Sequence, residues 1–228
     1  MRDASLILMT LNELPALREI LPQLPLLEFN ECLAVDGGST DGTRELLAQW
    51  HIPVIDQGKP GFGEAMRLGL ERASGRNRVI FCPDGNHLAS DVVKVLDALE
   101  KGADLVIASR FLRTSAHQQE GELLRLRARG ARLLSHLARK RNPNATVTDA
   151  TQSFRGITRE GLSRLQLTAS GFDISYQMTL QALNAGLTIG EVPTLEGRRL
   201  VGTARPPRLE SFFRHLKVLA MEGRAKKG

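Results

Sequence analysis

The sequence predicts an α/β fold in which a mostly parallel central sheet is flanked by helices. Between residues 4 and 108, apolar runs of strand length alternate with helical stretches, which is typical of consecutive βαβ units. Four of these runs end in polar turns, at residues 10–13, 36–41, 83–87 and 109–110. The 228 residues are 42% hydrophobic, which is enough for one buried core.

The first half of the chain supplies this alternation. Asn12 is the expected N-cap of the first helix, and Pro15 is tolerated in its first turn. We expect strands at residues 4–9, 31–35, 52–56, 78–82 and 104–108. The intervening helices are expected to end near residues 23, 50, 73 and 101.

After residue 110 the alternation becomes irregular. A basic amphipathic helix is expected at residues 123–140, because leucines and arginines alternate there at helical spacing. A polar loop at residues 149–155 leads into a short strand. A further helix is expected from Gly171 to about residue 185, and a strand at residues 187–192.

The C-terminal region combines helical periodicity with basic charge. Residues 208–223 form the last expected helix, so we divide the chain into a single α/β domain at 1–205 and a basic amphipathic C-terminal helix and tail at 206–228. The net charge is +6, yet residues 121–141 hold seven Lys/Arg against one Glu, and residues 198–228 hold nine against two. This segregation favours an anionic partner such as a phosphate group, a membrane surface or a nucleic acid, although solvated helix faces would also account for it.

Other features of the composition exclude some classes of protein. Aromatic residues make up only 4%, which argues against a base-stacking platform for single strands. Cys32 and Cys82 lie in apolar runs and are expected to be core thiols in a reducing cytoplasm. No signal peptide is expected at the N-terminus, and no apolar stretch approaches the length of about 20 residues that spans a bilayer.

The turn that follows the strand at 78–82 is the first candidate site. Asp84, between Pro83 and Gly85, could hold a divalent metal, because carboxylate oxygens suit hard cations; an ordinary turn is the alternative. The carboxyl ends of parallel strands meet at one edge of a sheet, so the four polar turns should bring carboxylates close to Arg110 there. The glycine loop at 58–63 matches neither the dinucleotide-binding fingerprint nor the P-loop.

Five motifs occur along the chain in an order that resembles a known family. They are Thr10-Leu11-Asn12-Glu13, Val35 to Thr43, Gly61 to Ala65 with Gly69, Pro83 to Asn86, and Ser109-Arg110-Phe111. Asp149 to Arg155, Gly171 to Asp173 and Glu191 to Pro193 also fit. Over about residues 4–205 the chain resembles a family 2 glycosyltransferase with the GT-A fold, of the dolichol-phosphate mannose synthase-like branch.

The resemblance implies a nucleotide-diphosphate-sugar donor, with UDP or GDP, and a divalent metal, Mg²⁺ or Mn²⁺. The metal residues it implies are Asp84 and Asn86. Phosphate-binding residues for the acceptor would be Arg110, Arg199 and Arg205. The donor-binding residues that it implies are Thr10, Leu11, Glu13, Val35, Asp36, Gly37, Lys59, Pro83 and Asp84.

Two positions depart from the pattern of the family. Cys82 stands where the first Asp of the D-x-D metal motif normally lies, so metal binding should be weakened or dispensable. Gly37 stands where many relatives have an acidic residue that reads the base, which leaves the identity of the base open.

The function implied is inverting transfer of a sugar to a polyprenyl phosphate at the cytoplasmic face of a membrane, by an enzyme bound peripherally through its basic helices. A phosphate acceptor is already ionised, whereas a hydroxyl acceptor requires a base, for which Asp173 and Asp149 are the candidates. Asp173 could instead only cap a helix. The alternatives are a soluble or polymeric hydroxyl acceptor, including a modified DNA base, and a non-catalytic nucleotide-binding module.

Overall fold

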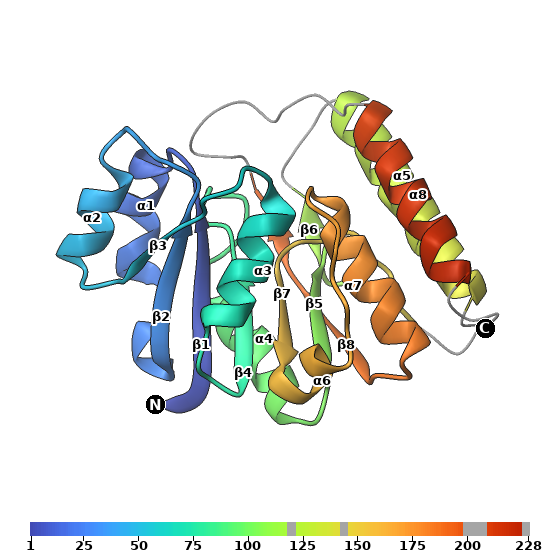
Figure 1. Ribbon diagram of the computed structural model, residues 1–228, viewed down its shortest axis with the longest axis horizontal. Coiled ribbons are helices and arrows are strands. Elements are labelled where there is room, and N and C mark those ends of the chain that lie inside the picture. Colours follow the sequence, from blue (N-terminus) through green and yellow to red (C-terminus); the bar gives the residue numbers. More distant parts are fainter. Residues whose placement is uncertain (118–121, 142–145, 198–208, 225–228) are drawn as a thin grey trace.

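The structure is a computed structural model that describes residues 1–117, 122–141, 146–197 and 209–224 (Figure 1). Its centre is a seven-stranded sheet with the strand order β3-β2-β1-β4-β7-β5-β8. The strands of this sheet are β1 (Arg2–Thr10), β2 (Phe29–Asp36), β3 (Val54–Asp56), β4 (Asn77–Phe81), β5 (Leu105–Ser109), β7 (Arg155–Thr158) and β8 (Ile189–Pro193). The expected α/β fold with a mostly parallel sheet is therefore confirmed.

Strand β7 is the exception to the parallel arrangement. It lies between β4 and β5 and runs antiparallel to both of them. The loop that precedes β7 therefore reaches the same edge of the sheet as the carboxyl ends of the parallel strands. Two short strands, β6 (Ala116–His117) and β9 (Leu195–Glu196), pair separately.

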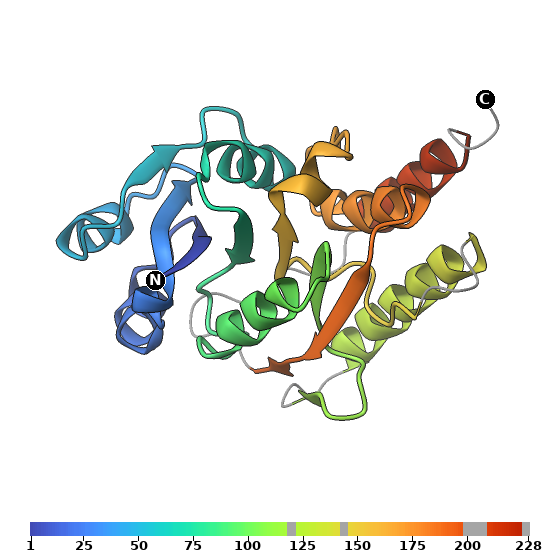
Figure 2. The same ribbon diagram turned by 90° about the horizontal axis from the view of Figure 1, so that it is seen from below.

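Helices cover both faces of the sheet (Figure 2). One face packs against α3 (Phe62–Arg72) and α7 (Asp173–Asn184), and the other against α1 (Leu14–Ile20) and α4 (Asp91–Glu100). The remaining helices are the 3-10 helices η1 (Leu21–Gln23) and η2 (Leu26–Glu28), and α2 (Thr43–Gln49), α5 (Glu122–Arg141), α6 (Arg159–Ser163) and α8 (Leu209–Arg224). Because apolar side chains point alternately to the two faces, Ile7 of β1 joins one core and Leu6 the other.

The two basic helices, α5 and α8, pack on α7 at one end of the sheet (Figure 1). Tyr176 of α7 is buried and donates a hydrogen bond to the Leu134 carbonyl of α5 over 2.9 Å. On α8, Val218 is buried in the same core, and Glu222 accepts hydrogen bonds from Gln177 and Gln181 of α7. The described part of the C-terminal helix is thus held by both apolar and polar contacts.

Candidate functional site

The ends of β1 and β2 form the first part of the site. Thr10 pairs with Asp36 in the register of the two strands, and its hydroxyl donates to Asp36 Oδ1 over 3.1 Å. The carboxylate of Asp36 is 1% exposed and also accepts bonds from the Gly38 and Ser39 amides. The bonds from the Gly38 and Ser39 amides are local and fold the turn at residues 36–39 around Asp36, while the bond from Thr10 ties this turn to the end of β1.

The loops that follow β1 and β2 are joined to each other. The Asn12 side chain accepts from the Thr40 amide over 2.9 Å, and the Asn12 amide donates to Ser39 Oγ over 2.8 Å. The expected N-cap role of Asn12 is therefore wrong, because its backbone adopts a left-handed φ of 56° and its side chain is used between the loops. Asp41 and Thr43 instead accept the first amides of the α1 region, from Leu14 and Glu13.

The glycine loop before α3 is fixed to the segment before α7. The Gly63 amide donates to the Ser170 carbonyl over 2.8 Å, and Arg67 donates to the Ala169 carbonyl over 2.6 Å. The rings of Phe62 and Phe172 stack with centroids 4.5 Å apart, although Phe172 is 58% exposed. Lys59, an expected donor residue, lies exposed at the tip of this loop.

Gly63→Ala should destabilise the protein and displace this loop. An ideal Cβ at Gly63 lies 2.2 Å from the Ala169 carbonyl oxygen, so backbone must move, and we expect a loss of about 1–3 kcal/mol in the free energy of unfolding. Gly130→Ala is the matched control: apart from the backbone of its own helix, no described residue has an atom within 4 Å of its ideal Cβ, and alanine in a helix interior should add about 0.5–1 kcal/mol. Urea denaturation of both variants measures the difference, and equal effects would contradict the close contact at Gly63.

The turn after β4 holds Asp84 in a fixed orientation. Asp84 is 6% exposed, and its two carboxylate oxygens accept the Asn86 backbone amide over 3.0 Å and the Asn86 side-chain amide over 3.2 Å. Cys82 is half-buried beneath this turn. Among the described residues, no group of three His, Cys, Asp or Glu side chains comes together as metal ligands. Within the described ranges, the carboxylate available to a metal at this turn is that of Asp84, with the Asn86 amide beside it.

His87 connects this turn to the segment after β8. Its Nδ1 lies 3.1 Å from the Leu195 carbonyl and 3.3 Å from Thr194 Oγ1, and the Gly197 amide donates to the Asn86 carbonyl. Burial lowers the pKa of His87 below its ordinary value, and the nearby Asp84 carboxylate only partly offsets this. His87 is thus neutral near pH 7 and acts as a link between the two loops.

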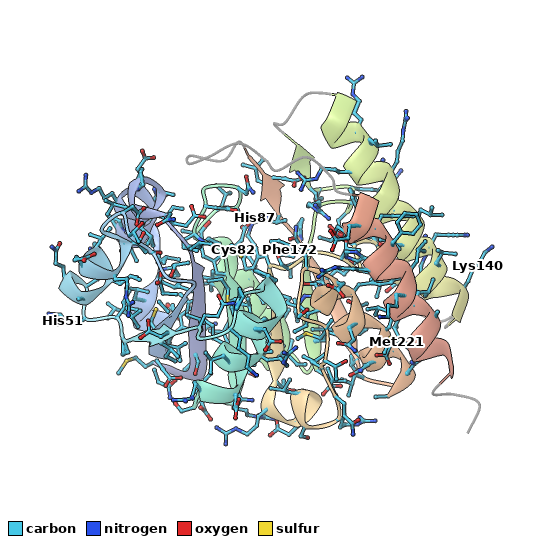
Figure 3. All side chains as sticks on the ribbon, turned by 45° about the horizontal axis from the view of Figure 1, so that its top comes forward. His51, Cys82, His87, Lys140, Phe172 and Met221 are labelled. Atoms are coloured by element: carbon cyan, nitrogen blue, oxygen red, sulfur yellow. The ribbon has the colours of Figure 1, made fainter. Side chains whose placement is uncertain are left out.

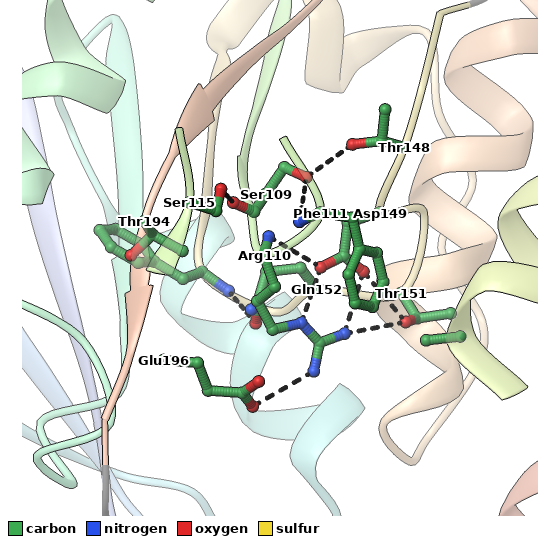
Figure 4. Close-up of polar contacts among 12 residues, drawn as sticks. Ser109, Arg110, Phe111, Ser115, Thr148, Asp149, Thr151, Gln152, Thr194 and Glu196 are labelled. Atoms are coloured by element: carbon green, nitrogen blue, oxygen red, sulfur yellow. Dashed lines mark hydrogen bonds and ion pairs between the residues drawn. The ribbon is translucent and has the colours of Figure 1, made fainter. Parts of the chain in front are cut away.

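Arg110 and Asp149 form a buried ion pair at the same edge (Figure 4). Arg110 Nε lies 2.7 Å from Asp149 Oδ2, and its second terminal nitrogen, Nη2, lies 2.9 Å from Asp149 Oδ1, which makes the pair bidentate. Its Nη1 lies 3.4 Å from Glu196 Oε1. Burial alone would raise the pKa of the fully buried Asp149, but the Arg110 charge and hydrogen bonds lower it below the ordinary value. Asp149 is therefore held as a carboxylate.

Glu191 holds the loop that carries Asp149. Its carboxylate accepts the Thr148 and Asp149 backbone amides over 2.9–3.0 Å and the Thr148 hydroxyl over 2.8 Å. Burial raises the pKa of Glu191, and these hydrogen bonds oppose that shift. The sequence analysis assigned Glu191 no such role; the signal that could have found it is a carboxylate near the end of a mostly apolar strand.

Comparison with known proteins identifies the family. Residues 5–166, about 70% of the chain, match the model of the family described as glycosyl transferase family 2. The chain belongs to glycosyl transferase family 2. It is 33% identical over 186 residues to "Glycosyltransferase AglJ" of Haloferax volcanii, which covers 81% of this chain and 60% of that protein. It is 25% identical to a dolichol-phosphate mannosyltransferase of Pyrococcus furiosus, over 96% of this chain and 64% of the relative.

Solved structures agree on the fold of this family 2 glycosyltransferase. Glucosyl-3-phosphoglycerate synthase from Mycobacterium tuberculosis, in complex with Mn²⁺, UDP and glucosyl-3-phosphoglycerate, superposes with a TM-score of 0.75. The match covers 97% of this chain and 80% of that chain at 22% identity, which establishes the GT-A fold alone. The chain spans about 60% of the length of two of the curated relatives it matches. No described helix is both long and apolar enough to cross a bilayer.

The remaining expected residues of this glycosyltransferase lie at different depths. Asp173 is the first residue of α7, 8% exposed, and no described residue donates a hydrogen bond to its Oδ1. Thr10 is buried, and Leu11 is 46% exposed. Arg199 and Arg205 lie outside the residues that the structure describes.

Arg155 closes the segment at residues 149–155, and its side chain is a buried charge to which the sequence assigned no role. It is fully buried at the start of β7 and donates to the Gln152 and Ser175 carbonyls. Burial lowers its pKa, and the charge of Asp149 opposes this shift. Arg155 therefore adds positive charge that interacts with the Asp149 carboxylate; its place at the start of a strand gave no sequence signal for this role.

Proposed function

We propose that the protein transfers a sugar from a nucleotide-diphosphate sugar to a polyprenyl phosphate, with inversion at the anomeric carbon. The proposal rests on one observation: a carboxylate and a guanidinium lie at the same edge of the sheet. The oriented carboxylate of Asp84 lies after β4, and the guanidinium of Arg110 lies after β5. Membership of glycosyl transferase family 2 supports the transfer chemistry.

The acceptor is proposed from the relatives and from the charge of the chain. Two curated relatives are described as a dolichol-phosphate mannosyltransferase and a polyprenol monophosphomannose synthase. An arginine at the edge of the sheet suits a phosphate acceptor, because a guanidinium matches phosphate geometry. Asp149 engages two nitrogens of Arg110, and Nη1 faces the Glu196 carboxylate at 3.4 Å, so a phosphate would approach this side of the guanidinium by displacing Glu196. Arg199 and Arg205 are proposed as further phosphate ligands.

Asp84 fits a divalent metal of the magnesium type. Such ions keep several waters and take one or two carboxylates together with substrate phosphates. A single oriented carboxylate with an adjacent amide, Asn86, meets this requirement, and the half-buried thiol of Cys82 adds no hard ligand. When bound, Mg²⁺ or Mn²⁺ would offset the charge that develops on the departing nucleotide diphosphate.

The residues of the chain have separate tasks in this mechanism. Thr10, Leu11, Glu13 and the turn at residues 35–37 would line the nucleotide, and Lys59 would approach its phosphates. Arg110 would hold the acceptor phosphate, which is already ionised and needs no base. Because this pocket would be fixed by hydrogen bonds before the substrates bind, the reacting groups would meet with little reorganisation.

A soluble hydroxyl acceptor is the second candidate, and Asp173 is the observation that favours it. A hydroxyl requires a general base. Asp149 is a poor base because its pKa is lowered in the ion pair with Arg110. Asp173 has no such ion pair among the described residues, so it would abstract the proton.

A panel of donors tests the proposal. UDP- and GDP-sugars are incubated with a polyprenyl phosphate or with soluble glycan acceptors, with and without Mg²⁺ or Mn²⁺. Consumption of a donor only when the lipid phosphate is present supports the proposal. Transfer only to a hydroxyl acceptor favours the second candidate, and no consumption of any donor contradicts both.

Helices α5 and α8 are proposed to dock the protein on an anionic, cytoplasmic membrane surface. Their exposed side chains combine basic and apolar groups, and Figure 3 shows Lys140 on the outer side of the pair. Exposed apolar residues here are Leu126, Leu133, Phe213 and Met221. Basic charge beside exposed apolar groups is the pattern of helices that lie in a membrane interface.

Reversing charge on α5 should weaken binding to vesicles. Each basic residue near an anionic leaflet contributes about 1 kcal/mol, so Arg125→Glu with Arg129→Glu should lower partitioning by at least about 30-fold. Sedimentation with phosphatidylserine-containing vesicles measures the effect, and phosphatidylcholine vesicles give the background. Arg18→Glu with Lys101→Glu makes the same change of net charge on exposed residues away from α5 and α8, so an equal loss in that variant would contradict docking through these helices.

A further inference from the structure

Gly37, Leu11 and Gln57 each follow the end of one of three neighbouring strands, and we call the narrow space between the last two side chains the gap. An ideal Cβ at Gly37 would lie 3.2 Å from Gln57 Oε1 and 3.3 Å from Leu11 Cδ1, closer than ordinary van der Waals contact, so these two side chains leave no room for a side chain at position 37. The Gly37 amide donates to the Thr10 carbonyl, and the Gln57 amide donates to the Asp36 carbonyl. The backbone on each side of the gap is therefore fixed by the sheet.

The side chain of Gln57 has a defined orientation. Its Nε2 donates to the Lys59 carbonyl over 2.5 Å and to the Gly61 carbonyl over 2.8 Å. Two carbonyl acceptors use both amide hydrogens, so the nitrogen must face the loop and the oxygen must face the gap. Among the residues that the structure describes, none donates a hydrogen bond to Gln57 Oε1. The gap thus has a pre-oriented acceptor on one side and the half-exposed apolar side chain of Leu11 on the other.

This combination suits the edge and face of a nucleobase. An apolar side chain can contact the face of a flat ring, while one acceptor reads an N–H on its edge. Uracil presents N3–H and guanine presents N1–H, whereas the corresponding ring nitrogens of cytosine and adenine carry a lone pair. If such a nitrogen faces an oxygen acceptor, no hydrogen bond can form, and the two lone pairs repel each other.

We propose that Gln57 Oε1 accepts the ring N–H of the donor's base and so selects uracil or guanine in place of a side chain at position 37. The assignment rests on the proposed nucleotide-sugar donor and adds the residue that determines its base. It also explains how position 37 can be a glycine: the hydrogen-bond acceptor for the base is then Gln57, which follows the neighbouring strand β3.

Isothermal titration of the full chain with nucleotide diphosphates in the presence of Mn²⁺ tests the assignment. The ligands are UDP, GDP, CDP and ADP, together with N3-methyl-UDP and N1-methyl-GDP, in which a methyl group replaces the hydrogen of the ring N–H. For the wild type, methylation of the preferred nucleotide should weaken binding about 10- to 100-fold, as expected when a buried acceptor loses its donor. Which of UDP and GDP binds identifies the base.

Two variants separate the acceptor from the loop contacts. Gln57→Glu and Gln57→Ala both remove the hydrogen bonds to the Lys59 and Gly61 carbonyls, so general loosening of the loop affects both. Only Gln57→Glu keeps an acceptor facing the gap. We expect the loss of affinity on methylation to persist in Gln57→Glu. It should fall to within about twofold in Gln57→Ala, because alanine neither accepts a hydrogen bond from the base nor crowds the added methyl group.

The outcomes distinguish this inference from the proposed function. Strong binding of UDP or GDP with no penalty for methylation, or with a penalty that persists in Gln57→Ala, overturns the role of Gln57 and leaves the donor proposal standing. Preferential binding of CDP or ADP does the same. If none of the nucleotides binds in the presence of Mn²⁺, both the inference and the proposed donor are overturned.

Discussion

Replacing Asp84 with asparagine is expected to lower kcat for sugar transfer by about 1000-fold, because about 4 kcal/mol of transition-state stabilisation would depend on this one carboxylate. Asparagine keeps an oxygen that can accept the Asn86 amide, so the turn should persist. Initial rates with the donor and acceptor found in the panel measure the loss. Thermal unfolding should be nearly unchanged, which separates loss of chemistry from loss of fold.

Asp97→Asn is the matched control for Asp84→Asn. Asp97 is a carboxylate of α4 that pairs with Arg2, far from the edge of the sheet that carries Asp84. Its variant should keep full activity. If Asp84→Asn reacts at the wild-type rate and still requires Mg²⁺ or Mn²⁺, the metal is held by other residues.

Replacing Asp149 with alanine is expected to destabilise the protein by about 3–5 kcal/mol, since removal of one partner leaves a buried charge uncompensated. Two guanidinium groups depend on this carboxylate: Arg110 through a bidentate pair, and fully buried Arg155 through its charge. Urea denaturation measures the free energy of unfolding. A loss below about 1 kcal/mol, typical of surface pairs, would contradict the buried network.

The pH dependence of stability gives an independent measure of the same carboxylate. The pKa of Asp149 is lower in the folded than in the unfolded chain, so its contribution is complete above the unfolded value of about 4 and is lost as the pH falls through the folded pKa. The wild type should therefore lose stability below pH 4 more steeply than Asp149→Asn. The double variant Arg110→Met with Asp149→Leu should recover only part of the loss, because Arg155 keeps its charge.

The sheet and its polar edge could be predicted from local patterns. The apolar run ending at Met9 and the turn beginning at Asp36 are contiguous signals, and parallel strands necessarily bring such turns together. The basic helices α5 and α8 were predicted because amphipathic spacing is also local. Family motifs then gave the GT-A fold.

Contacts between distant segments could not be predicted in the same way. The N-cap assigned to Asn12 failed because Asp41 and Thr43, some 30 residues later, supply the oxygens that Asn12 was expected to offer. The antiparallel course of β7 was equally hidden, since a four-residue strand carries no signal of direction. The pairing of Arg110 with Asp149 follows from that course and so required the structure.

The position of β7 has a consequence for how the protein is completed during synthesis. Strands β1 to β4 can pair as soon as they leave the ribosome, but β5 has no partner among them, because β7 separates it from β4. We expect a nascent chain that ends before Arg155 to expose the open edge of β4 and an unpaired β5, both of which invite aggregation. Once added, the four residues of β7 pair with both β4 and β5, and the later strand β8 then covers the remaining side of β5, so the edge that carries Asp84 and Arg110 would assemble as these strands stop being exposed.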